Sequence, residues 1–530
     1  MTLAAAPVRE RPPAPAPVPD LQPRRRAVVP AVALAGLVVF AALLRLEAIS
    51  THYWIDEALS VGLAGHDLTE IPSLLLRDGS PPLWYFLLHG WMEIFGTSAV
   101  ATHALSFVFA VVTVPVAWLV ARRLFGEQAA WFTGALAAIN PFVTYFATET
   151  RMYSLVVLLG LLVAGTFVAA FVDHQRGAAP WFAVSLAALL YTHNWGLYSA
   201  VAAVAAVLAL AVVGGDRRLL RRAAVVFGLV ALAYLPWVPT LLSQIENTGA
   251  PWSYTPSLRD VVRELAAVFR DERVLGVLVL AAGAGLLPLA RWWRSRDALA
   301  VAALGVLVAV PIGLGWVVAN VEPSWATRYL AVVVGPLLLV MGYGLSRARV
   351  VGMAAVAIMA VLVLQPITRV YGLTVPMDSK SNARDVAAHL APRLAPGDLV
   401  FVAQPEAVPL FRAELGGDVA FANPMGVVAR PTVMDWRDAE ARLRAADLAV
   451  LDPVLEGLHP GARVVVIQPG RSRSETDTAW IDLFRTAGRR TARALEVDPR
   501  FALVDRAPAI PGPYVTYAAT VWERVTDGAG

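Results

Sequence analysis

Eleven stretches of this chain are apolar over roughly the length that a helix needs to cross a lipid bilayer, which is about 20 residues. Repetition of such runs indicates a polytopic membrane protein with a mainly α fold. The composition agrees, since only 16% of residues are charged, against about 25% in soluble globular proteins. The runs are 27–46, 100–120, 128–147, 152–172, 181–194, 196–213, 223–243, 274–290, 298–319, 329–345 and 350–366.

Charged residues divide the chain into two domains. Of the 84 charged residues, 38 lie in 378–530, which makes that segment about 25% charged, whereas 1–377 is about 12% charged. We therefore expect a membrane domain over 27–366 followed by a water-soluble domain over 378–530. Residues 1–26, rich in proline and alanine, are expected to form a disordered cytoplasmic tail.

The short apolar segment 82–96 determines which loops face which side of the membrane. It starts at prolines and ends at a glycine after 15 residues, so we expect a helix that lies in the interface. The inner side up to residue 366 then carries 17 arginines and the outer side eight, in agreement with the positive-inside rule. This 11-span topology makes the loop 47–80 and the C-terminal domain extracytoplasmic.

The C-terminal domain alternates strand-like and helical patterns, which predicts a small α/β domain. It contains no glycine-rich phosphate loop, metal cluster or nucleophile elbow. A cap over the membrane site, an acceptor-binding module and a structural lid all remain open as its role. The strand candidates are 398–402, 448–451, 463–467 and 514–517, and the helix candidate is 476–493.

Composition excludes several kinds of site. The net charge of +4 is too small to indicate a nucleic-acid partner. The absence of cysteine excludes disulfides, thiolate metal sites and cysteine nucleophiles, and Lys380 is the only lysine available for Schiff-base chemistry. The spans carry almost no ionisable residue, which argues against an ion or proton path.

Ionisable side chains gather in the outer loops instead. Asp56 and Glu57 follow a Tyr-Trp pair typical of the headgroup level, where an unpaired carboxylate is costly and commonly functional. Asp67 and Glu70 are better explained as ordinary solvated side chains. Later outer turns add further candidates: Asp78, Glu149, Arg151, Tyr153, His193, Arg328 and Tyr329.

Structural roles compete for these later candidates. Glu149 and Arg151 could be helix-end charges that snorkel to the interface, and His193 alone would be an ordinary interfacial histidine. Arg328 could likewise be an anchor at the end of a span. A guanidinium there is also a natural clamp for a lipid-linked phosphate.

Five short motifs occupy these outer loops. They are Asp56-Glu57 after the first span, Asp-Gly-Ser-Pro-Pro-Leu-Trp-Tyr from Asp78, Glu149-Thr-Arg151-Met-Tyr153, Tyr-Thr-His193-Asn, and Arg328-Tyr329. In this order they resemble the GT-C membrane glycosyltransferases, nearest to the protein O-mannosyltransferase and lipid A aminoarabinose transferase group. The resemblance covers about 27–366 and leaves the C-terminal domain unmatched.

The resemblance implies an inverting transferase that moves a sugar from a polyprenyl-phosphate donor to an envelope glycan, lipid or protein acceptor on the outer face. Asp56 matches the base of the family, and Glu57 would orient it or the sugar. Arg328 and Arg151 would hold the lipid phosphate, and His193 would contact phosphate or sugar. The remaining substrate-binding candidates are Asp78, Glu149, Tyr153 and Tyr329.

No cofactor is assigned. Some GT-C enzymes use a divalent metal, and Asp56, Glu57 and Glu149 could ligate one through oxygen, but no six-ligand set is fixed by the sequence. Membrane lipids are the other expected partner. A lipid-linked glycan transporter or flippase and a non-catalytic envelope scaffold remain as alternatives.

Overall fold

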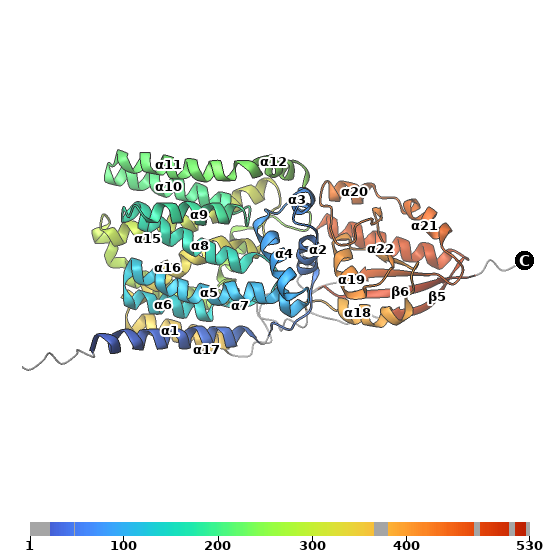
Figure 1. Ribbon diagram of the computed structural model, residues 1–530, viewed down its shortest axis with the longest axis horizontal. Coiled ribbons are helices and arrows are strands. Elements are labelled where there is room, and N and C mark those ends of the chain that lie inside the picture. The colour runs from blue at the N-terminus through green and yellow to red at the C-terminus, as the bar shows by residue number, and fades with distance from the viewer. Residues whose placement is uncertain (1–21, 47, 365–379, 471–477, 508–514, 526–530) are drawn as a thin grey trace, which may run out of the picture.

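The computed structural model describes residues 22–46, 48–364, 380–470, 478–507 and 515–525. A bundle of long helices runs along one axis, and an α/β domain is stacked on one end of it (Figure 1). The tail predicted for 1–26 lies outside the described residues as far as residue 21. Helix α1 (Gln22–Leu46) begins before the predicted span, so residues 22–26 belong to it rather than to the tail.

The bundle confirms a multi-pass membrane protein, because each of the eleven apolar runs falls on its helices. Among the described residues, eight helices are long and apolar enough to cross a membrane. They are α1, α5 (Ala99–Phe125), α8 (Tyr153–Phe167) with η1 (Val168–Val172), α10 (Gly196–Gly214), α11 (Arg217–Tyr234) continuing through η2 (Leu235–Trp237) into α12 (Val238–Asn247), α14 (Glu272–Leu286) with η3 (Leu287–Trp292), α15 (Arg296–Val321), and η4 (Thr327–Leu330) with α16 (Ala331–Arg347).

The three other apolar runs form shorter helices, so the count of eleven spans stays a prediction. Two are α9 (Ala178–Leu190) and α17 (Val350–Leu364). The run 128–147 is divided into α6 (Glu127–Ile139) and α7 (Pro141–Phe146). It divides because Asn140 is extended and its side chain caps α7, while a proline at the first position of α7 has no N–H to continue the helix.

Short helices cover the end of the bundle that faces the C-terminal domain. They are α2 (Ile55–Ala64), α3 (Ile71–Asp78) and α4 (Leu83–Phe95), and they lie between the long helices and the α/β domain (Figure 1). Helix α4 is the predicted interfacial segment, and it lies at the end of the bundle. A further short helix, α13 (Leu258–Ala267), follows α12.

The C-terminal domain is an α/β domain with one six-stranded sheet of order β3-β2-β1-β4-β6-β5. Strand β1 pairs in parallel with β2 and β4, and the other pairs are antiparallel. The strands are β1 (Leu399–Val402), β2 (Ala420–Asn423), β3 (Gly426–Val427), β4 (Arg463–Pro469), β5 (Phe501–Ala507) and β6 (Tyr517–Arg524). The helices are α18 (Ala383–Leu390), α19 (Val408–Leu415), α20 (Ala439–Ala445), α21 (Asp452–Gly457) and α22 (Ala479–Val497).

One of the four predicted strands is wrong, and another begins later than predicted. Segment 448–451 is the 3-10 turn η8 (Leu448–Leu451), because the side chain of Asp447 caps its first turn and α21 follows at once. The strand predicted at 514–517 begins only at Tyr517, and residue 514 lies outside the described residues. Strands β2, β3 and β5 were not predicted, since β3 has two residues and β5 has the charged residues Asp505 and Arg506 near its end.

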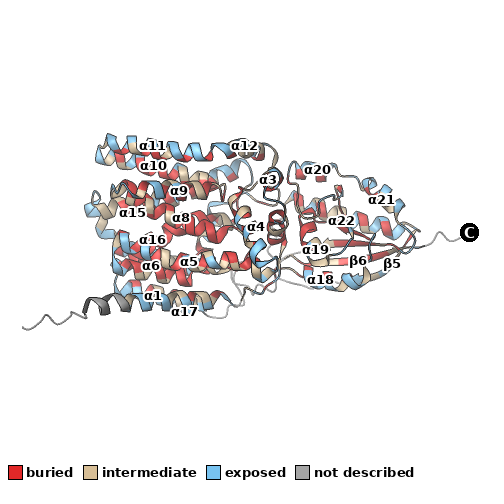
Figure 2. Ribbon diagram, in the orientation of Figure 1, coloured by how far each residue is buried: buried red, intermediate tan, exposed pale blue. Residues whose placement is uncertain are grey.

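The hydrophobic core of the C-terminal domain extends into the membrane domain. Ile55, Ala58 and Leu59 of α2 are buried in the same cluster as Phe411 and Trp436 of the C-terminal domain. Buried residues therefore continue across the junction (Figure 2). A buried large apolar side chain contributes about 1.5–3 kcal/mol, so this contact docks the domain firmly on the short helices.

Candidate active site

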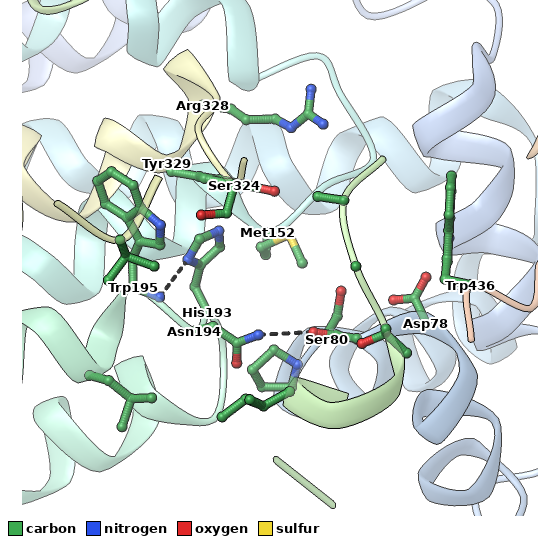
Figure 3. A pocket seen from close by; sticks show the side chains of 18 of the residues that line it. Asp78, Ser80, Met152, His193, Asn194, Trp195, Ser324, Arg328, Tyr329 and Trp436 are labelled. Carbon is green, nitrogen blue, oxygen red and sulfur yellow. Dashed lines mark hydrogen bonds between the residues drawn. The ribbon is translucent and has the colours of Figure 1, made fainter. Parts of the chain in front are cut away.

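A cavity of about 480 Å³ lies where the bundle, the short helices and the C-terminal domain meet. Side chains far apart in the sequence surround it, with Trp436 and Asp78 on one side and Trp195, His193 and Tyr329 on the other (Figure 3). Seven of the nine predicted site residues line it. They are Asp56, Asp78, Arg151, Tyr153, His193, Arg328 and Tyr329.

Asp56 and Arg328 form an open ion pair in this cavity. A terminal nitrogen of Arg328 lies 3.7 Å from Oδ2 of Asp56, which is beyond hydrogen-bond distance. Oδ2 of Asp56 and Nε of Arg328 have no hydrogen-bond partner among the described residues. The guanidinium also lies 4.4 Å from the ring centroid of Trp252. Each charged group therefore keeps a polar atom that can still form a hydrogen bond.

Arg151 brings a second guanidinium to the same cavity. One terminal nitrogen donates to Ser60 Oγ at 3.0 Å and to the backbone carbonyl of Asp56 at 3.4 Å. Its Nε has no partner among the described residues. Two half-buried guanidinium groups with unused donors make this part of the cavity suited to an anion such as a phosphate.

His193 supplies a neutral donor beside them. Burial and the positive charges of Arg151 and Arg328 lower the pKa of His193 to about 3. Its Nδ1 accepts a hydrogen bond from the backbone N–H of Trp195 at 3.1 Å (Figure 3). The single proton of the neutral ring therefore sits on Nε2.

Glu57, predicted as a second catalytic carboxylate, lies outside the cavity and is fully buried. Its Oε1 accepts from His103 Nε2 at 2.5 Å and from the Thr150 N–H at 2.8 Å, and its Oε2 accepts from the Trp54 N–H. Burial acts to raise the pKa of Glu57, but the attraction of His103 outweighs it and the pKa is lowered. Glu57 thus fixes the first turn of α2, from which Asp56 projects.

Glu149 also lies behind the cavity wall. Its Oε1 accepts from Trp54 Nε1 at 2.6 Å and from Lys380 Nζ at 3.2 Å. Lys380, from the start of the C-terminal domain, is only 3% exposed, and its Nζ lies 4.9 Å from the ring centroid of Tyr145. Burial raises the pKa of Glu149, and Lys380 opposes that rise. The pair ties the C-terminal domain to the membrane loops.

Three site residues were missed at the level of sequence. Trp252 lies against Arg328, Trp436 lines the cavity from the C-terminal domain, and Lys380 holds Glu149. The available signals were weak: two tryptophans in polar segments, and the chain's only lysine just after the last span.

The oxygen donors predicted as possible metal ligands are not brought together. Glu57 is turned to His103, whereas Glu149 is turned to Lys380. In the part of the chain that the structure describes, no group of three or more His, Asp or Glu residues is arranged to hold a metal ion. We therefore derive no step through a metal.

Comparisons with known proteins concern the fold of the chain. Residues 79–242 match the family model for dolichyl-phosphate-mannose-protein mannosyltransferase, a segment that holds Arg151 and His193. ArnT from Cupriavidus metallidurans in the apo state is 15% identical, with 94% of this chain and 98% of that chain covered and a TM-score of 0.58. The same protein bound to undecaprenyl phosphate gives 14% identity, 92% and 97% coverage, and a TM-score of 0.55.

A third solved structure is the archaeal oligosaccharyltransferase AglB from Archaeoglobus fulgidus, in complex with an inhibitory peptide and a dolichol-phosphate. It is 12% identical, with 82% of this chain and 69% of that chain covered and a TM-score of 0.53. No curated protein matches by sequence. The chain has the GT-C fold. This GT-C fold confirms the resemblance inferred from the outer-loop motifs, and ArnT shares it over the C-terminal domain as well as the bundle.

Proposed function

We propose that this protein is an inverting membrane glycosyltransferase that moves a sugar from a polyprenyl-phosphate donor to an acceptor hydroxyl. One observation carries the proposal: Asp56 has an unpartnered carboxylate oxygen 3.7 Å from the guanidinium of Arg328, in a cavity that also holds Arg151. The match to the mannosyltransferase family and the similarity to ArnT, solved with undecaprenyl phosphate, support it.

The lipid phosphate of the donor would bind between Arg328 and Arg151. Their unused N–H groups offer charge-assisted hydrogen bonds, and Nε2–H of His193 offers a neutral one. The phosphate gains negative charge as its bond to the sugar breaks, so these donors stabilise the transition state more than the bound donor.

The lipid tail would leave the cavity through its apolar side. Leu197 of α10, Leu241 and Ile245 of α12 and Val318 of α15 line that side. Ile245 is 67% exposed and Val318 is 38% exposed, so the lining continues onto the outer surface of the bundle. A polyprenyl chain there would stay in hydrocarbon while its phosphate reaches Arg328.

Asp56 would be the general base. It takes the proton of the acceptor hydroxyl as that oxygen attacks the anomeric carbon and the bond from this carbon to the phosphate oxygen breaks. A single displacement of this kind inverts the anomeric centre. Because Oδ2 of Asp56 has no competing donor within hydrogen-bond distance, it is free to accept this proton.

The cavity and the C-terminal domain would face the outside of the cell membrane. Arg217 and Arg218 lie at the start of α11, at the end of the bundle away from the C-terminal domain (Figure 1). Arg122 and Arg123 lie in the last turn of α5. Clustered arginines favour the cytoplasmic side, which leaves the opposite end extracytoplasmic.

The test is a donor screen with purified protein in detergent. Labelled polyprenyl-phosphate mannose, arabinose and aminoarabinose are incubated with mixed acceptors, and released polyprenyl phosphate is measured. We expect release from at least one donor, dependent on acceptor and abolished in a boiled sample. Absence of release from every donor would refute the transferase and favour a lipid-linked glycan transporter or an envelope scaffold.

A further inference from the structure

The cavity has two chemically different sides. Arg328 and His193 offer hydrogen-bond donors on one side, while Asp78 and Ser80 offer acceptors on the other (Figure 3). Tyr85 donates to Oδ2 of Asp78 at 2.9 Å, which fixes the carboxyl group in place. A phosphate would be repelled by Asp78, so this second side suits a neutral group rich in hydroxyl donors.

Trp436 forms the wall of that second side, although it belongs to the C-terminal domain. It is 7% exposed, lines the cavity, and lies on the same side as Asp78 (Figure 3). Trp436 also packs against Trp480, and their ring centroids lie 5.8 Å apart. An indole held in this way offers a rigid, flat apolar surface next to hydrogen-bond acceptors, which is the combination that binds a sugar ring.

Backbone contacts hold this wall against the membrane loops. The Trp436 N–H donates to the carbonyl of Arg77 at 2.8 Å, and the Asp438 N–H donates to the carbonyl of Asn247 at 2.9 Å. Between them, Arg437 pairs with Thr248 in an isolated β-bridge. The position of Trp436 over the cavity is therefore set by the membrane domain as well as by its own domain.

We propose that Trp436, Asp78 and Ser80 form the acceptor subsite, and that the acceptor is a neutral carbohydrate stacked on Trp436. This rests on the proposed function, because Asp56 must contact the acceptor hydroxyl. With the donor phosphate at Arg328, the acceptor lies on the side of Trp436. The C-terminal domain then acts as part of the acceptor site.

The experiment compares two acceptor classes with the whole protein in detergent. An octyl glycoside panel and a serine- and threonine-containing peptide are offered separately, with the donor that gives release in the screen. We expect transfer to at least one glycoside and none to the peptide. Transfer to the peptide alone would overturn the inference and leave the transferase intact, whereas no release from any donor would remove both.

Variants of Trp436 test whether the acceptor contacts this side chain. In Trp436→Leu the KM for the glycoside should rise roughly ten-fold or more, as for truncation of a buried aromatic contact, with the donor KM unchanged. Trp436→Phe keeps an aromatic face and should recover most of the loss. Trp522→Phe is the matched control, since Trp522 is 6% exposed in the same domain and does not line the cavity.

Other outcomes count against the acceptor assignment. A change in donor KM alone would place the donor sugar on Trp436. An unchanged glycoside KM in a folded Trp436→Leu protein would return the residue to a packing role. If Trp436→Leu does not fold, a folded Asp78→Asn protein whose glycoside KM equals that of wild type would refute the subsite.

Discussion

Two ion pairs lie at the end of the bundle that faces the C-terminal domain, and they differ in how their atoms are bonded. Lys380 and Glu149 are 3.2 Å apart, almost fully buried, and Trp54 donates to the same carboxylate oxygen. Asp56 and Arg328 are 3.7 Å apart, line a cavity, and keep unpartnered atoms. The closed pair joins two domains, whereas the open pair is left able to bind a substrate.

Removing the carboxylate of the open pair should have the largest effect. Asp56→Asn keeps the size of the side chain but cannot accept the proton, so turnover should fall ~10²–10⁴-fold. Donor KM and thermal stability should stay near those of wild type. The matched control is Asp67→Asn in the same loop, where the side chain is exposed and turnover should not change. Near-normal turnover of Asp56→Asn would move the base to Asp78, because Glu57 is enclosed by His103 and Thr150.

Breaking the closed pair of Lys380 and Glu149 should lower the stability of the protein rather than its turnover. Lys380→Met leaves Glu149 as an uncompensated buried carboxylate, which costs about 3–5 kcal/mol of unfolding free energy. Adding Glu149→Gln should recover most of that loss, since the buried charge is gone. Thermal unfolding in detergent measures both. Equal stability of the single and double variants would show that the loss in Lys380→Met does not come from an uncompensated Glu149 carboxylate.

Substituting the cation of the open pair should have an intermediate effect. Arg328→Lys keeps the charge but loses the planar fork, so donor KM should rise and turnover should fall, each roughly ten-fold. Steady-state kinetics over a donor series separates the two. Full retention of donor affinity in Arg328→Ala would reduce Arg328 to a membrane-interface anchor.

The smallest effect is expected from His193, through the pH dependence of stability. The unfolded side chain takes up a proton near pH 6.5, its ordinary pKa, but the folded one only near pH 3. The folded state therefore loses stability as pH falls from about 6.5 towards 3. His193→Asn, which keeps an acceptor for the Trp195 N–H, should weaken this acid sensitivity. Identical pH profiles of unfolding for the two proteins would contradict a neutral buried His193.

Much of the fold could be predicted from the sequence because bilayer crossing imposes a simple pattern of length and hydropathy. All eleven apolar runs fall on helices, and the segment 82–96 became α4 at the end of the bundle. The C-terminal sheet was predicted only in outline, because short strands such as β3 depend on their neighbours for burial.

The site could be predicted as a set of outer-loop residues, but not the division of roles within it. Asp56 and Glu57 are adjacent in sequence, yet one lines the cavity and the other is bonded to His103, 46 positions away. Lys380 and Glu149 are 231 positions apart. Such tertiary contacts decide which carboxylate is enclosed and which one faces the cavity. They cannot be predicted from the local sequence.

The most direct test of the account is a structure of Asp56→Asn with a polyprenyl-phosphate sugar bound. The account predicts the phosphate within hydrogen-bond distance of Arg328 and Arg151, the lipid tail along Leu241 and Ile245, and the anomeric carbon facing residue 56. A phosphate bound away from both arginines, or a sugar on the far side of the bundle from α2, would contradict it.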